Sequence, residues 1–222
     1  MKKIIPLFLL CLLLSTVSLY ADSGDFESLI KALAKSKDYS EQIEVLGAIS
    51  NVEKFTTEEQ DRLRKDLLEM SVNAENTVDP GTNTALLIQA VRLFPNDLRL
   101  SVKLAKAYVE LGQYQQALAV DADILTKNGN QSNDYELVTV AHAIQGLGLM
   151  MTNNYKLAYN EFKTVIGRDK NWSGGYFLMG AYYFRVKDFK EAAKYLRKCQ
   201  ELNPVHKGAA DMLVMLKKEG KI

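Results

Sequence analysis

Hydrophobic residues recur every three or four positions along most of the chain, which is the spacing of helices that bury one face. The pattern is clearest in the last third, where Met179, Gly180 and Tyr183 fall on one stripe of a helix. Ala192 lies on the apolar stripe of the helix that follows. The small residues Gly180 and Ala192 let the two backbones approach closely where they cross. The pattern therefore predicts a helical hairpin, ended by Pro204 because proline cannot continue a helix.

The same arrangement recurs at intervals of roughly 34 residues, here called one repeat length. Gly146 and Ala158 precede Gly180 and Ala192 by this interval. Residues 173–206 carry Tyr176-x2-Met179-Gly180-x2-Tyr183, then Ala192-x3-Leu196, then Pro204. This series resembles a tetratricopeptide repeat (TPR), whose pattern is W-x2-L-G-x2-Y, A-x3-F and P. The resemblance implies an all-α fold, a right-handed α-α superhelix (a TPR solenoid) of about five helix hairpins plus a C-terminal capping helix.

The repeats divide the chain into a leader, residues 1–21, and one TPR-like solenoid domain, residues 22–222. In the second repeat Asp79-Pro80-Gly81 is expected to lengthen the turn between the helices, and in the third an Asn/Gly/Ser-rich stretch follows Asn128. The repeat units are expected at about 23–56, 57–97, 98–138, 139–172 and 173–206, with the cap at 207–222.

The first residues have the regions of a secretory signal. Met1-Lys2-Lys3 is basic, Ile4 to Leu14 is apolar, and Ala21 is a small residue after which cleavage is expected. Export would place the mature protein in the bacterial periplasm or outside the cell, whereas an uncleaved leader would anchor it to the membrane. Contact with a membrane is expected only in that second case.

The net charge limits the classes of partner that we expect, and the cysteine content indicates the role of Cys199. The formal net charge is +1, and removal of Lys2 and Lys3 with the leader makes it about −1. Such a balanced charge disfavours non-specific nucleic-acid binding, so no nucleic-acid partner is expected. Cys199 is the one cysteine left after cleavage, and we interpret it as a buried packing thiol.

No motif for catalysis, metal binding or a cofactor stands out, so the chain is predicted not to be an enzyme and to need no cofactor. His142 and His206 lack the spacing of a zinc motif, and we interpret His142 as a packing residue. Oxygen-bearing side chains around a loop lack the order of an EF-hand, so we interpret them as helix caps and solvated loop residues. They are Asp121, Asp123, Asn128, Asn130, Asn133 and Asp134. An enzyme would need a charge-perturbed cleft around His142 and this loop.

The resemblance implies that the first helix of each hairpin lines the inner side, where TPR partners bind. Two of these helices carry a second apolar stripe beside the one that closes the hairpin. The stripe would suit an amphipathic helix or an extended apolar segment with acidic groups. The candidate partner-binding residues are Val140, Ala143, Leu147, Met150, Met151, Phe177, Ala181 and Phe184, with Arg99, Lys106 and Arg185 at the sides.

These residues predict a non-catalytic periplasmic scaffold or adaptor that binds a protein partner through its concave face. Three alternatives remain open at the level of sequence. The stripe could line an apolar cavity of a ligand-binding or transporter-associated subunit, or it could join copies of the chain in a homo-oligomer. Neighbouring repeats and the end helix could also cover much of it, since first helices pack on first helices in a solenoid.

Overall fold

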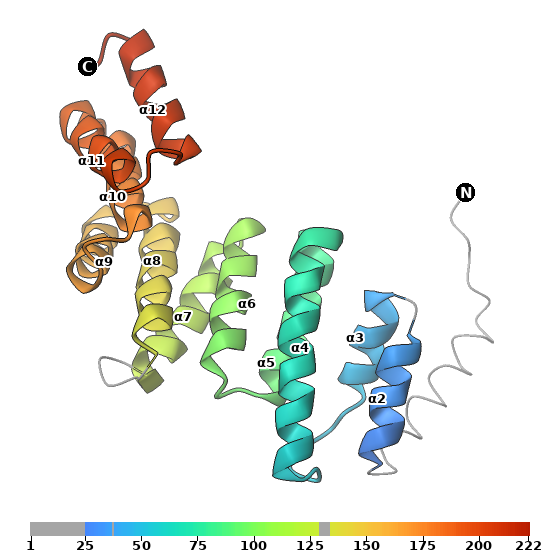
Figure 1. Cartoon of the computed structure of the whole chain (residues 1–222). Coiled ribbons are helices and arrows are strands. Elements are labelled where there is room, and N and C mark those ends of the chain that lie inside the picture. Colours follow the sequence, from blue (N-terminus) through green and yellow to red (C-terminus); the bar gives the residue numbers. More distant parts are fainter. Residues whose placement is uncertain (1–24, 37, 129–133) are drawn as a thin grey trace, which may run out of the picture. The chain divides into compact units, whose positions relative to one another are not determined.

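The computed structural model describes residues 25–36, 38–128 and 134–222, so the expected leader, residues 1–21, lies outside it. Every regular element in the described part is a helix, as Figure 1 shows. The all-α prediction is confirmed, because these helices pack in chain order as TPR-like hairpins. The described residues form eleven helices: α2 (Phe26–Lys35), α3 (Tyr39–Gly47), α4 (Thr57–Thr77), α5 (Pro80–Leu93), α6 (Leu98–Glu110), α7 (Tyr114–Asn128), α8 (Tyr135–Met151), α9 (Tyr155–Arg168), α10 (Ser173–Arg185), α11 (Phe189–Leu202) and α12 (Lys207–Lys218).

The described chain divides into two compact units, and the division falls in α6 between Leu104 and Ala105. In the first unit, α2 to α5 share one apolar core, to which each helix contributes its buried stripe. Helix α4 begins with a capping box, in which Thr56 and Glu59 each satisfy a free backbone amide of the other. The main residues of this core are Phe26, Leu29, Leu46, Ile49, Leu63, Leu67, Leu86 and Ala90.

The turn expected at Asp79-Pro80-Gly81 is instead the start of α5. Asp79 is the N-cap, with its carboxylate accepting from the Thr82 amide, and Pro80 occupies the first turn. Proline fits there because the amide it lacks would have no partner in the helix. The expectation of a lengthened turn was therefore wrong, and only Val78 and Asp79 separate α4 from α5.

In the second unit, the hairpins α8–α9 and α10–α11 close through their glycines as predicted. A Cβ atom added to Gly146 would lie 2.6 Å from Cε1 of Phe162, and one added to Gly180 would lie 2.8 Å from Cγ of Leu196. Phe162 and Leu196 are themselves fully buried. The two glycines thus set the distance between the helices of each hairpin.

The turns of these two hairpins use a left-handed backbone residue at the same place. Asn153 between α8 and α9 has φ 64°, and Lys187 between α10 and α11 has φ 66°. The aspartate that follows Lys187 caps α11, because the Asp188 carboxylate accepts from the Glu191 amide at 3.1 Å. The turn therefore reverses the chain and starts the second helix within a few residues.

Candidate protein-interaction face

The second apolar stripe of α8 is partly covered in the folded chain. Ala143 and Met150 are buried, with 6% and 5% of their surface exposed. Leu147 packs against the core that Met150 shares with α9 and α10. Val140 and Met151 are half-buried. Of the five residues proposed on α8, Val140, Leu147 and Met151 therefore keep some surface that a partner can touch.

On α10, Phe177 and Phe184 are half-buried by the chain itself. The Phe177 ring packs on the imidazole of His206 at a tilt of 37°, with centroids 4.7 Å apart, and lies against Gly208 at the start of α12. The Phe184 ring meets Phe189 edge-on at 5.8 Å. Part of the predicted stripe is thus covered by neighbouring elements, one of the arrangements that the sequence left open.

The three basic residues proposed at the sides differ in their surroundings. Arg185 is exposed at the end of α10. Lys106 is exposed on α6, with Nζ 3.7 Å from Oε1 of Glu110. Arg99 belongs to the first unit, where its guanidinium lies 2.9 Å from Oδ2 of Asp97, the residue that caps α6. The Arg99 guanidinium is therefore held by Asp97 within the first unit.

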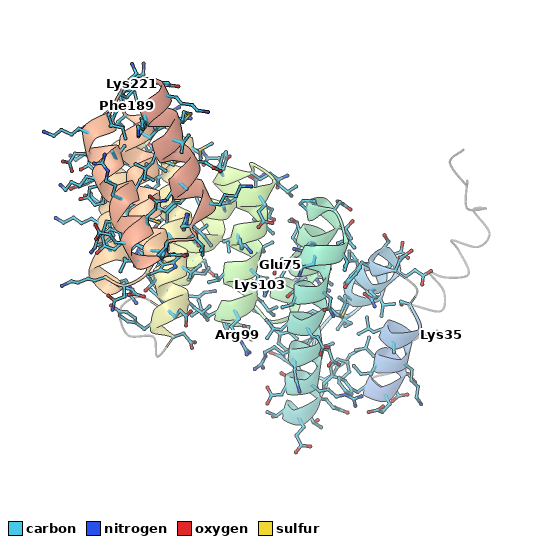
Figure 2. All side chains as sticks on the ribbon, turned by 45° about the horizontal axis from the view of Figure 1, so that its top comes forward. Lys35, Glu75, Arg99, Lys103, Phe189 and Lys221 are labelled. Carbon is cyan, nitrogen blue, oxygen red and sulfur yellow. The ribbon has the colours of Figure 1, made fainter. Side chains whose placement is uncertain are left out.

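One salt bridge and one cation–π contact hold further side chains, and Figure 2 labels the residues of both. Lys103 Nζ lies 3.3 Å from Oε2 of Glu75 in the first unit. Lys221 Nζ lies 5.4 Å from the centre of the Phe189 ring, which ties the end of the chain to the start of α11. None of these four residues belongs to the proposed apolar stripe.

Helix α12 continues the stripe, which the sequence reasoning did not include. Leu147 and Ala181 are one repeat length apart, and the next position in that series is Met215, with 37% of its surface exposed. Around Met215 stand Asp211 and Lys218, the counterparts of Phe177 and Phe184. The repeat interval itself was the signal that could have identified Met215.

A buried acidic cluster lies in the same unit, between α7, α8 and α9. Asp121 is fully buried, and neither of its carboxylate oxygens has a hydrogen-bond partner in the described part of the chain. Burial, with the nearby charge of Glu161, raises the pKa of Asp121 to about 8. Glu161 in turn pairs with Nδ1 of His142 at 2.7 Å. At neutral pH the Asp121 carboxyl is therefore mostly protonated.

The cluster corrects the interpretation of Asp121 as a capping or solvated loop residue, because Asp121 lies inside α7 on its buried face. The structure does bring Asp121 and His142 to the same carboxylate, that of Glu161. An enzyme at this place would need the acid to reach its substrate, and Asp121 has no exposed surface. Asn130 and Asn133, the loop residues of the same set, lie outside the described residues.

Two further searches cover only the described residues. No three histidine, cysteine, aspartate or glutamate side chains there are placed so that they could hold a metal ion. No helix in that part is both long and apolar enough to cross a membrane.

The family model for the tetratricopeptide repeat matches residues 173–204, which are α10, α11 and the turns beside them. The fold is similar to that of MamA (residues 41 to the end) from Desulfovibrio magneticus RS-1, with 21% identity over 71% of this chain and 85% of that one, at a TM-score of 0.55. A MamA RS-1 double mutant is 18% identical over 81% and 93% of the two chains, with a TM-score of 0.54. MamA MSR-1 is 19% identical over 84% of this chain and 97% of that one, with a TM-score of 0.51.

At these identities the likeness to the MamA structures concerns the fold alone. No curated protein matches the chain in sequence. The repeat match covers α10 and α11, and the hairpin before it has the same glycine contact and the same left-handed turn. Residues 173–204 thus match the tetratricopeptide repeat, and the described helices pack as TPR-like hairpins in a fold similar to that of the MamA structures.

Proposed function

We propose that the protein is a non-catalytic scaffold that binds a segment of a partner protein through the first helices of its second unit, α8, α10 and α12. The observation that carries this proposal is the row formed by Leu147, Ala181 and Met215, one on each helix at successive repeat lengths. All three keep exposed surface, and Met215 keeps the most as a large apolar side chain. An apolar row that the chain leaves partly open suits a protein segment.

The charges around this row indicate the chemistry of the segment. Arg185 at the end of α10 and Lys218 on α12 are exposed, and Asp211 lies on the same side of α12. A partner with apolar residues at helical or alternating spacing and mainly acidic flanks would satisfy both the row and the two basic residues. TPR folds in general act as scaffolds for such segments, which supports the same assignment.

The test uses crosslinking in cells, affinity capture and mass spectrometry on the mature protein. The informative variant is Met151→Asp with Met215→Asp, since both side chains are partly exposed and neither closes a hairpin. Phe177 is a poorer choice, because its ring packs on His206 and its loss would disturb α12. Leu157→Asp is the matched control, an exposed apolar residue of α9 outside the row.

We expect one defined protein to be captured by the native chain and by Leu157→Asp, and to be lost with the double variant while its circular dichroism stays native. Capture that is equal in all three would contradict the proposal. Crosslinks only between copies of the chain would instead make the row an oligomer interface.

We further propose that the protein is exported, on the basis of the leader-like residues 1–21. Mass spectrometry of the intact protein from the periplasmic fraction tests this directly. We expect a chain that begins at Asp22. A full-length chain in that fraction would mean an uncleaved leader, and its absence from the fraction would contradict export.

A further inference from the structure

Helix α12 packs on α11 in the same register as α10 packs on α9. Gly175 of α10 contacts Val165 of α9, and the ring of Tyr182 lies 5.6 Å from that of Tyr159. One repeat length later, Ala209 and Leu216 occupy these two places on α12, and both are fully buried. Helix α12 therefore takes the position of the first helix of a further hairpin.

The face of α12 that would receive a second helix is open. In α8 and α10 that face holds Gly146 and Gly180, which are covered by Phe162 and Leu196 of the following helix. The next position in this series is Val214, which keeps 53% of its surface exposed. No described helix covers it. A large apolar side chain thus projects where the earlier first helices have a glycine and a close neighbour.

Lysines surround Val214 on this face. Positions three, four and seven residues away lie on the same side of a helix, and within α12 they hold three lysines, one aspartate and one alanine. No ion pair joins Lys207, Lys217 or Lys218 to a carboxylate in the described part of the chain, and their side chains are exposed. The lysines are Lys207, Lys217 and Lys218, the aspartate is Asp211 and the alanine is Ala210.

We propose that this face of α12, centred on Val214 and flanked by its lysines, binds an acidic amphipathic helix of a partner protein, which takes the place of a hairpin's second helix. The surface is centred on Val214 instead of Met215, and it shares only Asp211 and Lys218 with the surroundings of the row formed by Leu147, Ala181 and Met215. The partner carries alanine or glycine opposite Val214, because the valine already fills the space that a glycine leaves open in α8 and α10. Its flanks carry aspartate or glutamate, which meet the lysines.

Charge also disfavours a second copy of the chain, and the composition of α12 disfavours a membrane, as the occupant of the Val214 face. Two copies of this face would bring two sets of three lysines together, which is repulsive. An anionic membrane would attract the lysines, but helices that lie in a membrane surface usually insert Trp, Phe or Leu, and the centre here is Val214 beside Asp211. A protein helix satisfies both the single apolar projection and the mixed charge.

The test is a titration of the full mature chain with a labelled synthetic helical peptide that has alanines on one face and glutamates on both flanks, followed by fluorescence anisotropy. The variant is Lys207→Glu with Lys217→Glu, two exposed lysines of this face that the first-helix row does not use. Its matched control is Lys156→Glu with Lys163→Glu, two exposed lysines of α9. Circular dichroism of both variants checks that the fold is kept.

We expect the double reversal on α12 to weaken binding at least about tenfold, and the reversal on α9 to leave it unchanged. A peptide with lysine in place of glutamate should recover affinity for the α12 variant, since the charges are then complementary again. Native binding should also weaken as salt is added.

Four outcomes would overturn the proposal. The acidic peptide fails to bind the native chain, or it binds the α12 variant equally well. Vesicles with anionic lipid bind the native chain but not the α12 variant, which assigns the face to a membrane. Sedimentation shows self-association that depends on Lys207 and Lys217, which assigns the face to a second copy of the chain. Each of these leaves the first-helix row, and its capture experiment, unaffected.

Discussion

Asp121 is the residue whose surroundings conflict most with its chemistry. Its carboxyl is fully buried on α7 without a hydrogen-bond partner in the described residues, and Glu161 lies nearby with His142 on its other side. Burial raises its pKa from 3.8 to about 8. In the unfolded chain the same group ionises near its ordinary pKa, so folding retains a proton. The stability from this group is therefore complete below about pH 4 and is lost as pH rises to about 8.

Replacement Asp121→Asn should stabilise the protein at neutral pH by about 1–3 kcal/mol, because the amide cannot ionise and stays neutral at every pH. The gain should be small near pH 4 and grow toward pH 8. Urea unfolding at several pH values measures it. Asp123→Asn is the control, since Asp123 is exposed and pairs with Lys127 at 2.8 Å. A wild-type pH dependence that persists in Asp121→Asn would contradict the assignment.

Lys187 adopts a strained backbone conformation in the turn between α10 and α11. Its φ of 66° is a conformation that side chains with a Cβ adopt with strain, whereas glycine adopts it freely. We expect Lys187→Gly to raise the stability by about 0.5–1 kcal/mol. Thermal unfolding measures the change. Lys190→Gly, within α11, should instead destabilise by about 1 kcal/mol, and equal effects of the two variants would refute the argument.

At the scale of the hairpin, the two helices pack closely at a glycine of the first helix. Gly180→Leu adds a side chain where even a Cβ would lie 2.8 Å from Cγ of Leu196. We expect it to destabilise the fold by about 1–3 kcal/mol through overpacking. Gly167→Ala is the control in α9, because nothing lies within 4 Å of the added Cβ.

The control should be neutral or stabilising, since alanine favours a helix more than glycine does. Both changes can be measured by urea unfolding. An unchanged midpoint for Gly180→Leu would mean that the crossing is looser than these distances indicate.

Some of the helices and turns could be predicted from the sequence, and others could not. The hairpins α8–α9 and α10–α11 could be predicted because glycine, alanine and aromatic residues recur at a fixed interval. The start of α5 was missed, since Asp-Pro-Gly fits a turn as well as a capped helix whose first turn holds proline. Asp121 could have been suspected, because it lies on one stripe with Ala117 and Ile124, yet its burial depends on α8 and α9.

The binding face was the hardest part to predict, and the reason is physical. An apolar stripe on a first helix is the same pattern whether a partner, a neighbouring hairpin or the end helix covers it. Phe177 belongs to the stripe by spacing, but His206 and Gly208 cover one side of it. Met215 was not in the stripe considered because α12 was interpreted as a polar cap. Only contacts between hairpins separate these cases.

At the scale of the whole molecule, the division into two compact units predicts that they respond separately to damage. A solenoid is held together mainly by contacts between neighbouring hairpins, so destabilisation should spread weakly along the chain. Leu67→Ala in α4 and Phe162→Ala in α9 each remove a fully buried side chain, one in each unit. Each should cost about 2–5 kcal/mol within its own unit.

Hydrogen exchange on the full chain, read by mass spectrometry, distinguishes the two responses. Leu67→Ala should accelerate exchange in α2 to α5 much more than in α8 to α11, and Phe162→Ala should do the reverse, because local opening follows local stability. Val72→Ala in α4 is the control, since that side chain is largely exposed. If either core variant accelerates exchange evenly along all described helices, the chain unfolds as one cooperative body, and the two units are then parts of a single folding domain.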